Sequence, residues 1–355
     1  MEIIKPGTKI DFIGRRQLAY VFSAILIFLS LASLIYHGGP KYGIDFSGGT
    51  VVQIKCMDDA AVSDIRKGLD AVGMGGATVQ RFGAEAKNEY LIRTDQTLIT
   101  GEGFSEEVRQ AVADATGMDV VIERVEMVGP QVGEDLREKA LMALFYALLF
   151  ITIYISGRFE LKWVLSAVMA AVLIGAVYLF SLFNVSIPLL IVVALVVALI
   201  MFWQLRLKFA MGAIVALMHD VFITMGIFSV FDIEFSLPIV AALLTIIGYS
   251  LNDTIVVFDR IRENIKKYAR KPLETVINQS VNETLSRTIM TSFTTLIVLI
   301  CLFILGGAII HDFALAMIVG VVVGTYSSVY VSSPVLLWLQ EAPGKGAAEA
   351  MGQAG

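Results

Sequence analysis

The chain has 355 residues, of which 57% are apolar and 17% are charged, and its mean hydropathy is +0.76. An ordinary soluble protein carries about 25% charged residues, so this composition excludes a pair of soluble domains, a disordered chain and a disulfide scaffold. The net charge is −5, and neither Cys56 nor Cys301 has a neighbouring histidine or cysteine to suggest a metal site. The composition predicts a polytopic membrane protein.

Eight apolar stretches are long enough to cross a bilayer, which takes about 20 residues. They run over 18–36, 140–156, 163–183, 187–203, 209–230, 236–258, 288–307 and 312–338. The first is too long for a cleaved signal peptide and lacks a suitable cleavage site, so we expect an uncleaved anchor. Lysines and arginines cluster in the alternate connections, such as 260–271, which predicts eight spans with both termini in the cytoplasm.

One long polar segment, 37–137, lies between the first two stretches and is expected outside the membrane. It has 17 acidic and 10 basic residues, which argues against nucleic-acid binding. Its patterns predict strands over 50–56, 77–82, 89–93 and 119–127, and helices over 60–72 and 105–116. The order β-α-β-β-α-β is that of a small ferredoxin-like α+β domain.

Polar residues inside the apolar stretches are the candidates for function, because an ionisable group in the membrane is costly. Asn252 and Asp253 are candidates for proton coupling, and Asp253 lies six residues before Asp259, which we place at the cytoplasmic edge. At 1.5 Å per residue it is about 9 Å deep. The alternative is a helix end in the headgroups, but the apolar run 255–258 argues against it.

Two further polar groups have structural as well as functional interpretations. His219 and Asp220 lie about 16 Å into their stretch, where they could handle protons or simply fasten helices together. Arg287 opens a stretch with a hydroxyl-bearing face and lies at a depth similar to that of Asp253. Arg287 could reach the phosphates of the headgroups, or it could pair alternately with Asp253 as part of a proton-coupling element.

Four motifs, in this order along the chain, resemble the SecF family of protein-export membrane subunits, which is part of the RND-type transporter superfamily. They are the run 43–50, the run 129–133, the run 248–264 and the run 285–288. The signature residues are Gly43, Asp45, Phe46, Gly48, Gly49, Asp259, Arg260, Arg262, Glu263 and Asn264. The resemblance covers nearly the whole chain, and the seventeen-residue run 248–264 is its most specific part.

The resemblance implies an accessory subunit of the Sec translocase in the bacterial inner membrane. It would act with SecD and use the proton-motive force to promote export of unfolded polypeptides. SecYEG and SecA would be further partners, with YajC and YidC as additional candidates. The protein would not be an enzyme and would need no organic cofactor. Asp253 and Arg287 would take the places of the family's intramembrane aspartate and arginine.

One feature departs from the family pattern, which has six spans. The extra residues, about 162–205, form a predicted helical hairpin. Its motif 160–163 parallels 206–209, and 186–188 parallels 236–238, which favours a local duplication. On that register Leu173 and Ile174 replace His219 and Asp220, so the first copy would lack coupling residues.

The expected domains are therefore 1–36, the cytoplasmic N-terminus and first span; 37–137, the periplasmic domain; 138–339, an RND-like bundle with the extra hairpin; and 340–355, a cytoplasmic tail. A small-molecule or lipid exporter of the RND type is the alternative function, and a static assembly scaffold is a third. Exporters of that type normally have a duplicated chain with two large exterior domains, whereas this chain has one small domain.

Overall fold

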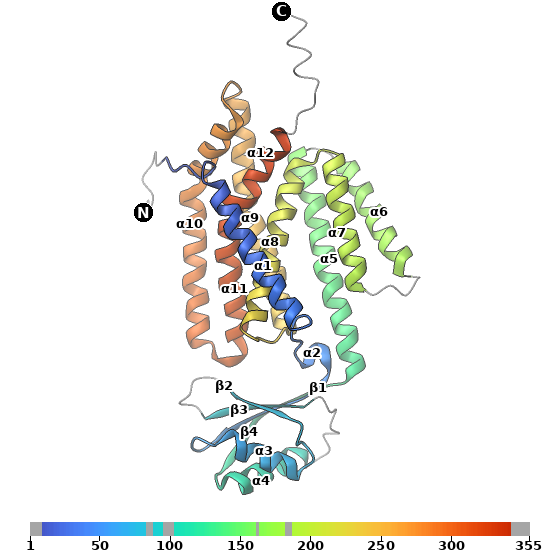
Figure 1. Ribbon diagram of the computed structural model, residues 1–355, viewed down its shortest axis with the longest axis vertical. Helices are drawn as coiled ribbons and strands as arrows, with labels where there is room; N and C mark the ends of the chain where they lie inside the picture. Colours follow the sequence, from blue (N-terminus) through green and yellow to red (C-terminus); the bar gives the residue numbers. More distant parts are fainter. Residues whose placement is uncertain (1–8, 83–87, 95–102, 161–162, 182–186, 342–355) are drawn as a thin grey trace, which may run out of the picture.

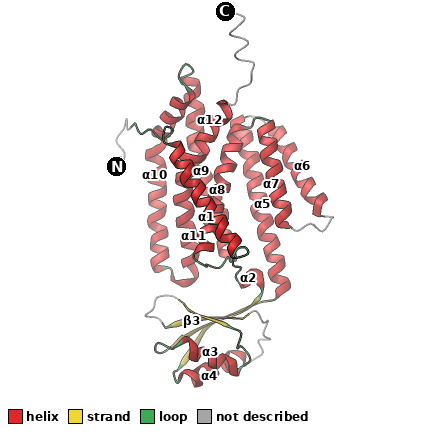
Figure 2. Cartoon of the chain, viewed as in Figure 1, coloured by secondary structure: helices red, strands yellow, loops and turns green. Residues whose placement is uncertain are grey.

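The computed structural model describes residues 9–82, 88–94, 103–160, 163–181 and 187–341. A bundle of long helices stands on a small four-stranded sheet, and two short helices cover the far face of that sheet (Figure 1). The start of α1 and the end of α12 both lie at the end of the bundle away from the sheet. Figure 2 shows that the strands lie together in one small unit and that the rest is almost entirely helical. We call this unit, between residues 44 and 128, the exterior unit.

The exterior unit follows the predicted order of strands and helices. After the short helix α2 (Ile44–Ser47) come β1 (Gly49–Cys56), α3 (Val62–Ala71), β2 (Thr78–Phe82), β3 (Glu89–Thr94), α4 (Phe104–Thr116) and β4 (Val120–Val128). The sheet is antiparallel with the order β2-β3-β1-β4. Alternate strand residues such as Val52, Ile54 and Ile92 form a core with Leu69 and Val112 of the helices. The period-2 and period-3.6 patterns place these residues inside.

Among the described residues, six helices are long and apolar enough to cross a membrane. They are α1 (Arg16–Tyr36), α5 (Pro130–Glu160), α8 (Lys208–Val230), α9 (Leu237–Lys267), α10 (Leu273–Leu305) and a last segment, Ile310–Leu339. That last segment comprises most of α11 (Gly307–Ser327), a π-helical turn η2 (Ser328–Ser332) and most of α12 (Ser333–Glu341). The chain is therefore a multi-pass membrane protein.

The helices α9 and α10 are longer than the stretches predicted over 236–258 and 288–307. α9 continues to Lys267, and α10 begins at Leu273, well before Arg287. Hydropathy detects only the part of a helix that lies in lipid, so polar helical ends were missed. At 1.5 Å per residue each helix is more than 45 Å long, which exceeds the ~30 Å hydrocarbon core.

The predicted extra hairpin consists of α6 (Trp163–Ser181) and α7 (Ile187–Gln204), which lie beside α5 on the side away from α10 (Figure 1). Within the described residues their apolar runs, Trp163–Leu179 and Val192–Gln204, are shorter than those of the six long helices. The count of eight spans thus stays a prediction.

The helices α9 and α11 approach each other unusually closely. A side chain at Gly320 would collide with Ile246, and a Cβ at Gly324 would lie 2.9 Å from the Cβ of Ser250. Small residues at such spacing let two helix backbones approach within a membrane. This contact fixes the face of α9 from which Ser250 and, one turn later, Asp253 project.

Candidate intramembrane polar site

Asp253 lies inside the bundle, on α9. The residue is 3% exposed, and its Oδ2 atom is buried with no hydrogen-bond partner. The Oγ1 atom of Thr288 on α10 is also buried without a partner. Because a buried polar atom without a partner costs about 1–3 kcal/mol, such atoms are rare and need an explanation.

Arg287 does not form an ion pair with Asp253. Of the ion pairs between the described residues, all within 4.0 Å, none joins these two side chains. The Arg287 guanidinium nevertheless acts on the Asp253 carboxylate at longer range, and the Ser292 hydroxyl acts on it as a hydrogen-bond donor. Arg287 is exposed on the surface of the bundle, as is Asn252. The predicted site residues thus form a buried carboxylate with a cation nearby at the rim.

His219 and Asp220 form a second cluster, on α8. The Nδ1 atom of His219 lies 2.9 Å from Oδ1 of Asp220, and the two residues are 4% and 0% exposed. Ser250 of α9 and Ser327 of α11 donate hydrogen bonds of 2.6 and 2.8 Å to the other oxygen, Oδ2. Both oxygens of Asp220 therefore have partners, and the cluster joins three helices.

Hydrogen-bond directions fix the proton count of this cluster. Tyr326 donates to the carbonyl of Ala19 at 2.8 Å, so the Ser23 hydroxyl, 3.0 Å away, donates to the Tyr326 oxygen. Ser23 must then accept from Nε2 of His219, at 3.0 Å. With Nε2 protonated, Nδ1 and the facing carboxylate oxygen of Asp220 share one proton. The pair is neutral as a unit whichever atom holds that proton.

Sequence reasoning missed the hydroxyl groups of the cluster around His219 and Asp220, which are Ser23, Ser250, Ser327 and Tyr326. A single serine in an apolar stretch is common and carries little signal. The spacing of Ser250, three residues before Asp253, and the serines at 327–328 and 332–333 were the available clues. Gln, Asn or charged residues would have been easier to detect because their insertion costs more.

The signature residues at the exterior end tie the sheet to the bundle. The glycines Gly48 and Gly49 have φ values of +73° and +118°, and a Cβ at Gly48 would lie 2.8 Å from Pro130 at the start of α5. Only glycine adopts this backbone at such close approach without strain. Phe46 is buried against Phe235, and Asp45 accepts a hydrogen bond from the backbone N–H of Leu237.

The signature residues near the other end of α9 tie three helices together. Asp259 pairs with Arg158 of α5 at 2.7 Å, and Arg262 donates to the backbone carbonyl of Arg158. Asn264 is buried and donates to Ser280 and Glu283 of α10. Arg260 pairs with Glu263 at 3.0 Å and lies 3.6 Å from Glu283. These residues hold the helices on either side of Asp253 in register.

The two cysteines are far from both polar clusters in the chain. Cys56 ends β1 in the core of the exterior unit, where burial raises the pKa of its thiol, and Cys301 is exposed on α10. Across the described ranges, three or more potential metal ligands nowhere come together.

These features define a multi-pass membrane protein with a signature junction between the sheet and the bundle and two buried carboxylates among its helices. The family model "Protein export membrane protein SecD/SecF, C-terminal" matches residues 107–199 and 182–342, and "SecD/SecF GG Motif" matches residues 34–56. The chain belongs to the SecF family of protein translocase subunits, which is a family of transport components.

Relatives of full length support this assignment. The protein translocase subunit SecF of Magnetococcus marinus is 43% identical over 346 residues, covering 95% of this chain and 94% of the relative. The SecF of Vibrio alginolyticus is 39% identical, covering 95% of this chain and 92% of its own. The crystal structure of SecDF, a translocon-associated membrane protein from Thermus thermophilus, matches 94% of this chain with a TM-score of 0.73 and 32% identity. This chain spans 39% of that SecDF chain.

Proposed function

We propose that this chain couples the proton-motive force to protein export through Asp253, acting together with SecD. The observation that carries the proposal is the buried Oδ2 of Asp253, which lacks a partner although Arg287 lies nearby. Burial disfavours an ionised carboxylate, and an approaching cation favours it. A change in the separation of Asp253 and Arg287 would therefore change the affinity of the carboxylate for a proton.

The exposed polar groups of α9 and α10 support the proposal that a partner protein packs on this face within the membrane. Arg287 and Asn252 are exposed on the bundle surface, at a depth where contact with lipid is costly. A second bundle packed on this face would remove them from lipid. The longer SecDF chain, of which this chain matches about two fifths, supports SecD as that bundle. SecYEG, SecA, the exported unfolded polypeptide, YajC and YidC are the other partners that family membership suggests.

The proposed layout places 37–137 in the periplasm and 138–339 in the inner membrane. Residues 1–36 comprise the cytoplasmic N-terminus and the first span, and 340–355 form a cytoplasmic tail. The antiparallel order β2-β3-β1-β4, with α3 and α4 on one face, supports a ferredoxin-like exterior domain. The basic residues of 260–271, at the end of the bundle far from the sheet, support the orientation.

The hairpin about 162–205 is proposed to add two spans to the usual six, giving eight. The family model matches the chain twice, over 107–199 and 182–342, which supports a local duplication. A cysteine introduced within 184–186 should react with a membrane-impermeant thiol reagent added from the periplasm. Labelling from the cytoplasm alone would contradict the eight-span layout.

The substitution Asp253→Asn tests the coupling role. In cells that depend on this protein, we expect export to fall to the level of cells without it and to lose its additional sensitivity to an uncoupler. Asp312→Asn is the matched control, because Asp312 is a half-exposed carboxylate at the exterior edge. Normal, uncoupler-sensitive export by the Asp253→Asn variant would refute proton coupling at Asp253. A drug or lipid phenotype with normal secretion would instead favour the small-molecule exporter.

A further inference from the structure

A short segment outside the membrane, residues 41–49, joins the sheet to the start of α9; we call it the junction segment. It runs beside the turn 231–236 that connects α8 to α9. Phe235 donates its backbone N–H to the carbonyl of Lys41 at 2.6 Å, and Gly43 donates to the carbonyl of Phe235 at 2.9 Å. Tyr42 and Phe235 thus form a parallel β-bridge. The turn and the junction segment are held together as neighbouring strands are.

Asp45 of the junction segment completes the N-terminus of α9. Its Oδ2 accepts the backbone N–H of Leu237, the first residue of the helix, at 2.9 Å. The first N–H groups of a helix have no partner within it, and a carboxylate is favoured there by the helix dipole. Ser236, at the N-cap position, makes no side-chain capping bond. A residue from a distant part of the chain therefore supplies this cap.

The junction segment is also fixed to the sheet and to α5. It leads directly into β1 at Gly49, and α2 within it packs against the first turns of α5. A Cβ on Gly133 of α5 would lie 2.9 Å from the backbone nitrogen of Gly48, so the two backbones are in contact. The sheet and the beginning of α9 are thereby connected through one short, tightly packed piece of chain.

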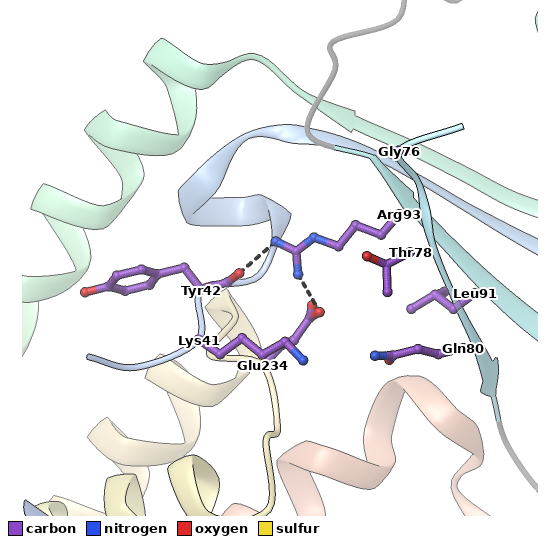
Figure 3. A pocket seen from close by; sticks show the side chains of 8 residues that line it. All are labelled: Lys41, Tyr42, Gly76, Thr78, Gln80, Leu91, Arg93 and Glu234. Atoms are coloured by element: carbon purple, nitrogen blue, oxygen red, sulfur yellow. Dashed lines mark hydrogen bonds and ion pairs between the residues drawn. The ribbon is translucent and has the colours of Figure 1, made fainter. Parts of the chain in front are cut away.

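Arg93 of β3 makes a second connection (Figure 3). Its guanidinium donates to the carbonyl of Tyr42 at 2.7 Å and to the Ser47 hydroxyl at 2.9 Å, and it pairs with Glu234 of the α8–α9 turn. Arg93 and Glu234 are 15% and 30% exposed, so this ion pair is partly shielded from water. It spans a cleft of about 320 Å³ between the sheet and the bundle.

We infer that Asp45 and Arg93 are transmission residues, which make the exterior domain move with the outer end of α9 as one unit. The inference rests on the proposed function of Asp253. Asp253 lies 16 residues along α9 from Leu237, about 24 Å, and the helix between them is unbroken. A displacement of α9 at the carboxylate is therefore carried to the sheet through the cap at Asp45 and the ion pair of Arg93.

The first test fixes the junction covalently. Tyr42→Cys and Phe235→Cys place one thiol on each of the two paired segments. Paired strands lie about 4.8 Å apart, which is within the range of Cα–Cα distances that a disulfide spans. Exposed Cys301 is replaced by serine, and Cys56 is buried. We expect the oxidised protein, in its complex with SecD, to retain export within twofold of the reduced form. Loss of export on oxidation that returns on reduction would show that the two segments must separate, and would overturn the inference.

The second test measures transmission directly. Spin labels at Asp114→Cys of α4 and Leu305→Cys of α10, both exposed positions, report the distance between sheet and bundle. In the membrane-embedded complex we expect Asp253→Asn to shift this distance distribution, and Asp45→Ala to abolish the shift. Asp45→Asn keeps an oxygen for the Leu237 N–H and should preserve it.

The outcomes separate the inference from the proposed function. A shift that persists in Asp45→Ala, or no shift caused by Asp253→Asn, would overturn transmission through Asp45 even if Asp253 remains essential for export. Export that is unaffected by Asp253→Asn would instead refute the coupling role. That result comes from the export assay and not from the spin-label distance. The reciprocal exchange of Arg93→Glu and Glu234→Arg should restore at least half of the export lost in either single variant, whereas no recovery would overturn the role of the ion pair.

Discussion

Two aspartates in one bundle, Asp220 and Asp253, differ in what surrounds them. Both are almost completely buried, at 0% and 3% exposure. Asp220 has a partner on each oxygen and shares a proton with His219, so the cluster is satisfied and neutral. Asp253 has an oxygen with no partner and a cation that is not yet in contact.

The two environments indicate two roles: Asp220 holds helices together, whereas Asp253 serves the function. A fully hydrogen-bonded buried network rigidifies a core, and each member is costly to remove. A buried carboxylate oxygen without a partner needs an explanation, and another conformation or protonation state that uses it is one. Because Ser250 and Asp253 are one turn apart on α9, the satisfied cluster holds the helix that carries the unsatisfied group. The two sites thus have complementary roles, which substitutions at the two aspartates can separate.

The largest effect is expected for Asp253→Asn on function with little effect on folding. Export should fall to background, whereas the thermal unfolding temperature of the purified protein in detergent should stay unchanged or rise. The reason is that the amide removes a buried ionisable group whose Oδ2 has no partner. A large fall in unfolding temperature would show that Asp253, like Asp220, stabilises the fold, and would contradict the difference between the two aspartates.

Asp220→Ala should show the opposite behaviour. The truncated side chain would leave Ser250, Ser327 and His219 without the carboxylate that each of them contacts in the buried cluster. Removing one partner of a buried charged pair costs about 3–5 kcal/mol, so we expect a marked loss of thermal stability. Expression and unfolding temperature are the measurements, and Asp312→Ala is the control, because Asp312 belongs to a half-exposed pair with the preceding His311. Unchanged stability with lost export would make Asp220 a second coupling residue.

The sequence located both carboxylates but could not rank them. His219, Asp220, Asp253 and Arg287 are detectable because charged or imidazole groups are improbable among apolar residues. Their difference depends on helix rotation and on the hydroxyls of Ser250 and Ser327, which come from other helices and carry no local signal. The strands and helices of the exterior unit were predictable from periodicity, whereas the polar first turns of α10 were not.

The junction between sheet and bundle was only partly predictable. The run 43–50 was identified as a family motif, and the positive φ of Gly48 and Gly49 explains two of its positions. The roles of Asp45 and Arg93 depend on contacts with residues 234–237, nearly 200 and 140 positions away in the sequence. No spacing rule within one segment relates residues so far apart.

A moderate effect is expected when the two serines that hold Asp220 are removed. Ser250→Ala and Ser327→Ala each delete one hydrogen bond to a carboxylate oxygen, worth about 1.5–3 kcal/mol. Because both bonds reach the same oxygen, the second deletion leaves it without a partner, so the double variant should cost more than the sum. Unfolding temperatures of the two single variants and the double variant test this. Strict additivity would mean that the network does not act as a unit.

The smallest effect should come from Thr288→Val, which probes another of the buried atoms that have no hydrogen-bond partner. The hydroxyl of Thr288 is buried without a hydrogen bond, so exchanging it for a methyl removes a desolvation cost and keeps the shape. We expect an unfolding temperature equal to or slightly above that of the native chain. Thr284→Val is the matched control on the same helix, because its hydroxyl donates to the carbonyl of Ser280. If Thr288→Val lowered stability as much as Thr284→Val, the Thr288 hydroxyl would have a partner in the folded protein, and the contrast between satisfied and unsatisfied groups would weaken.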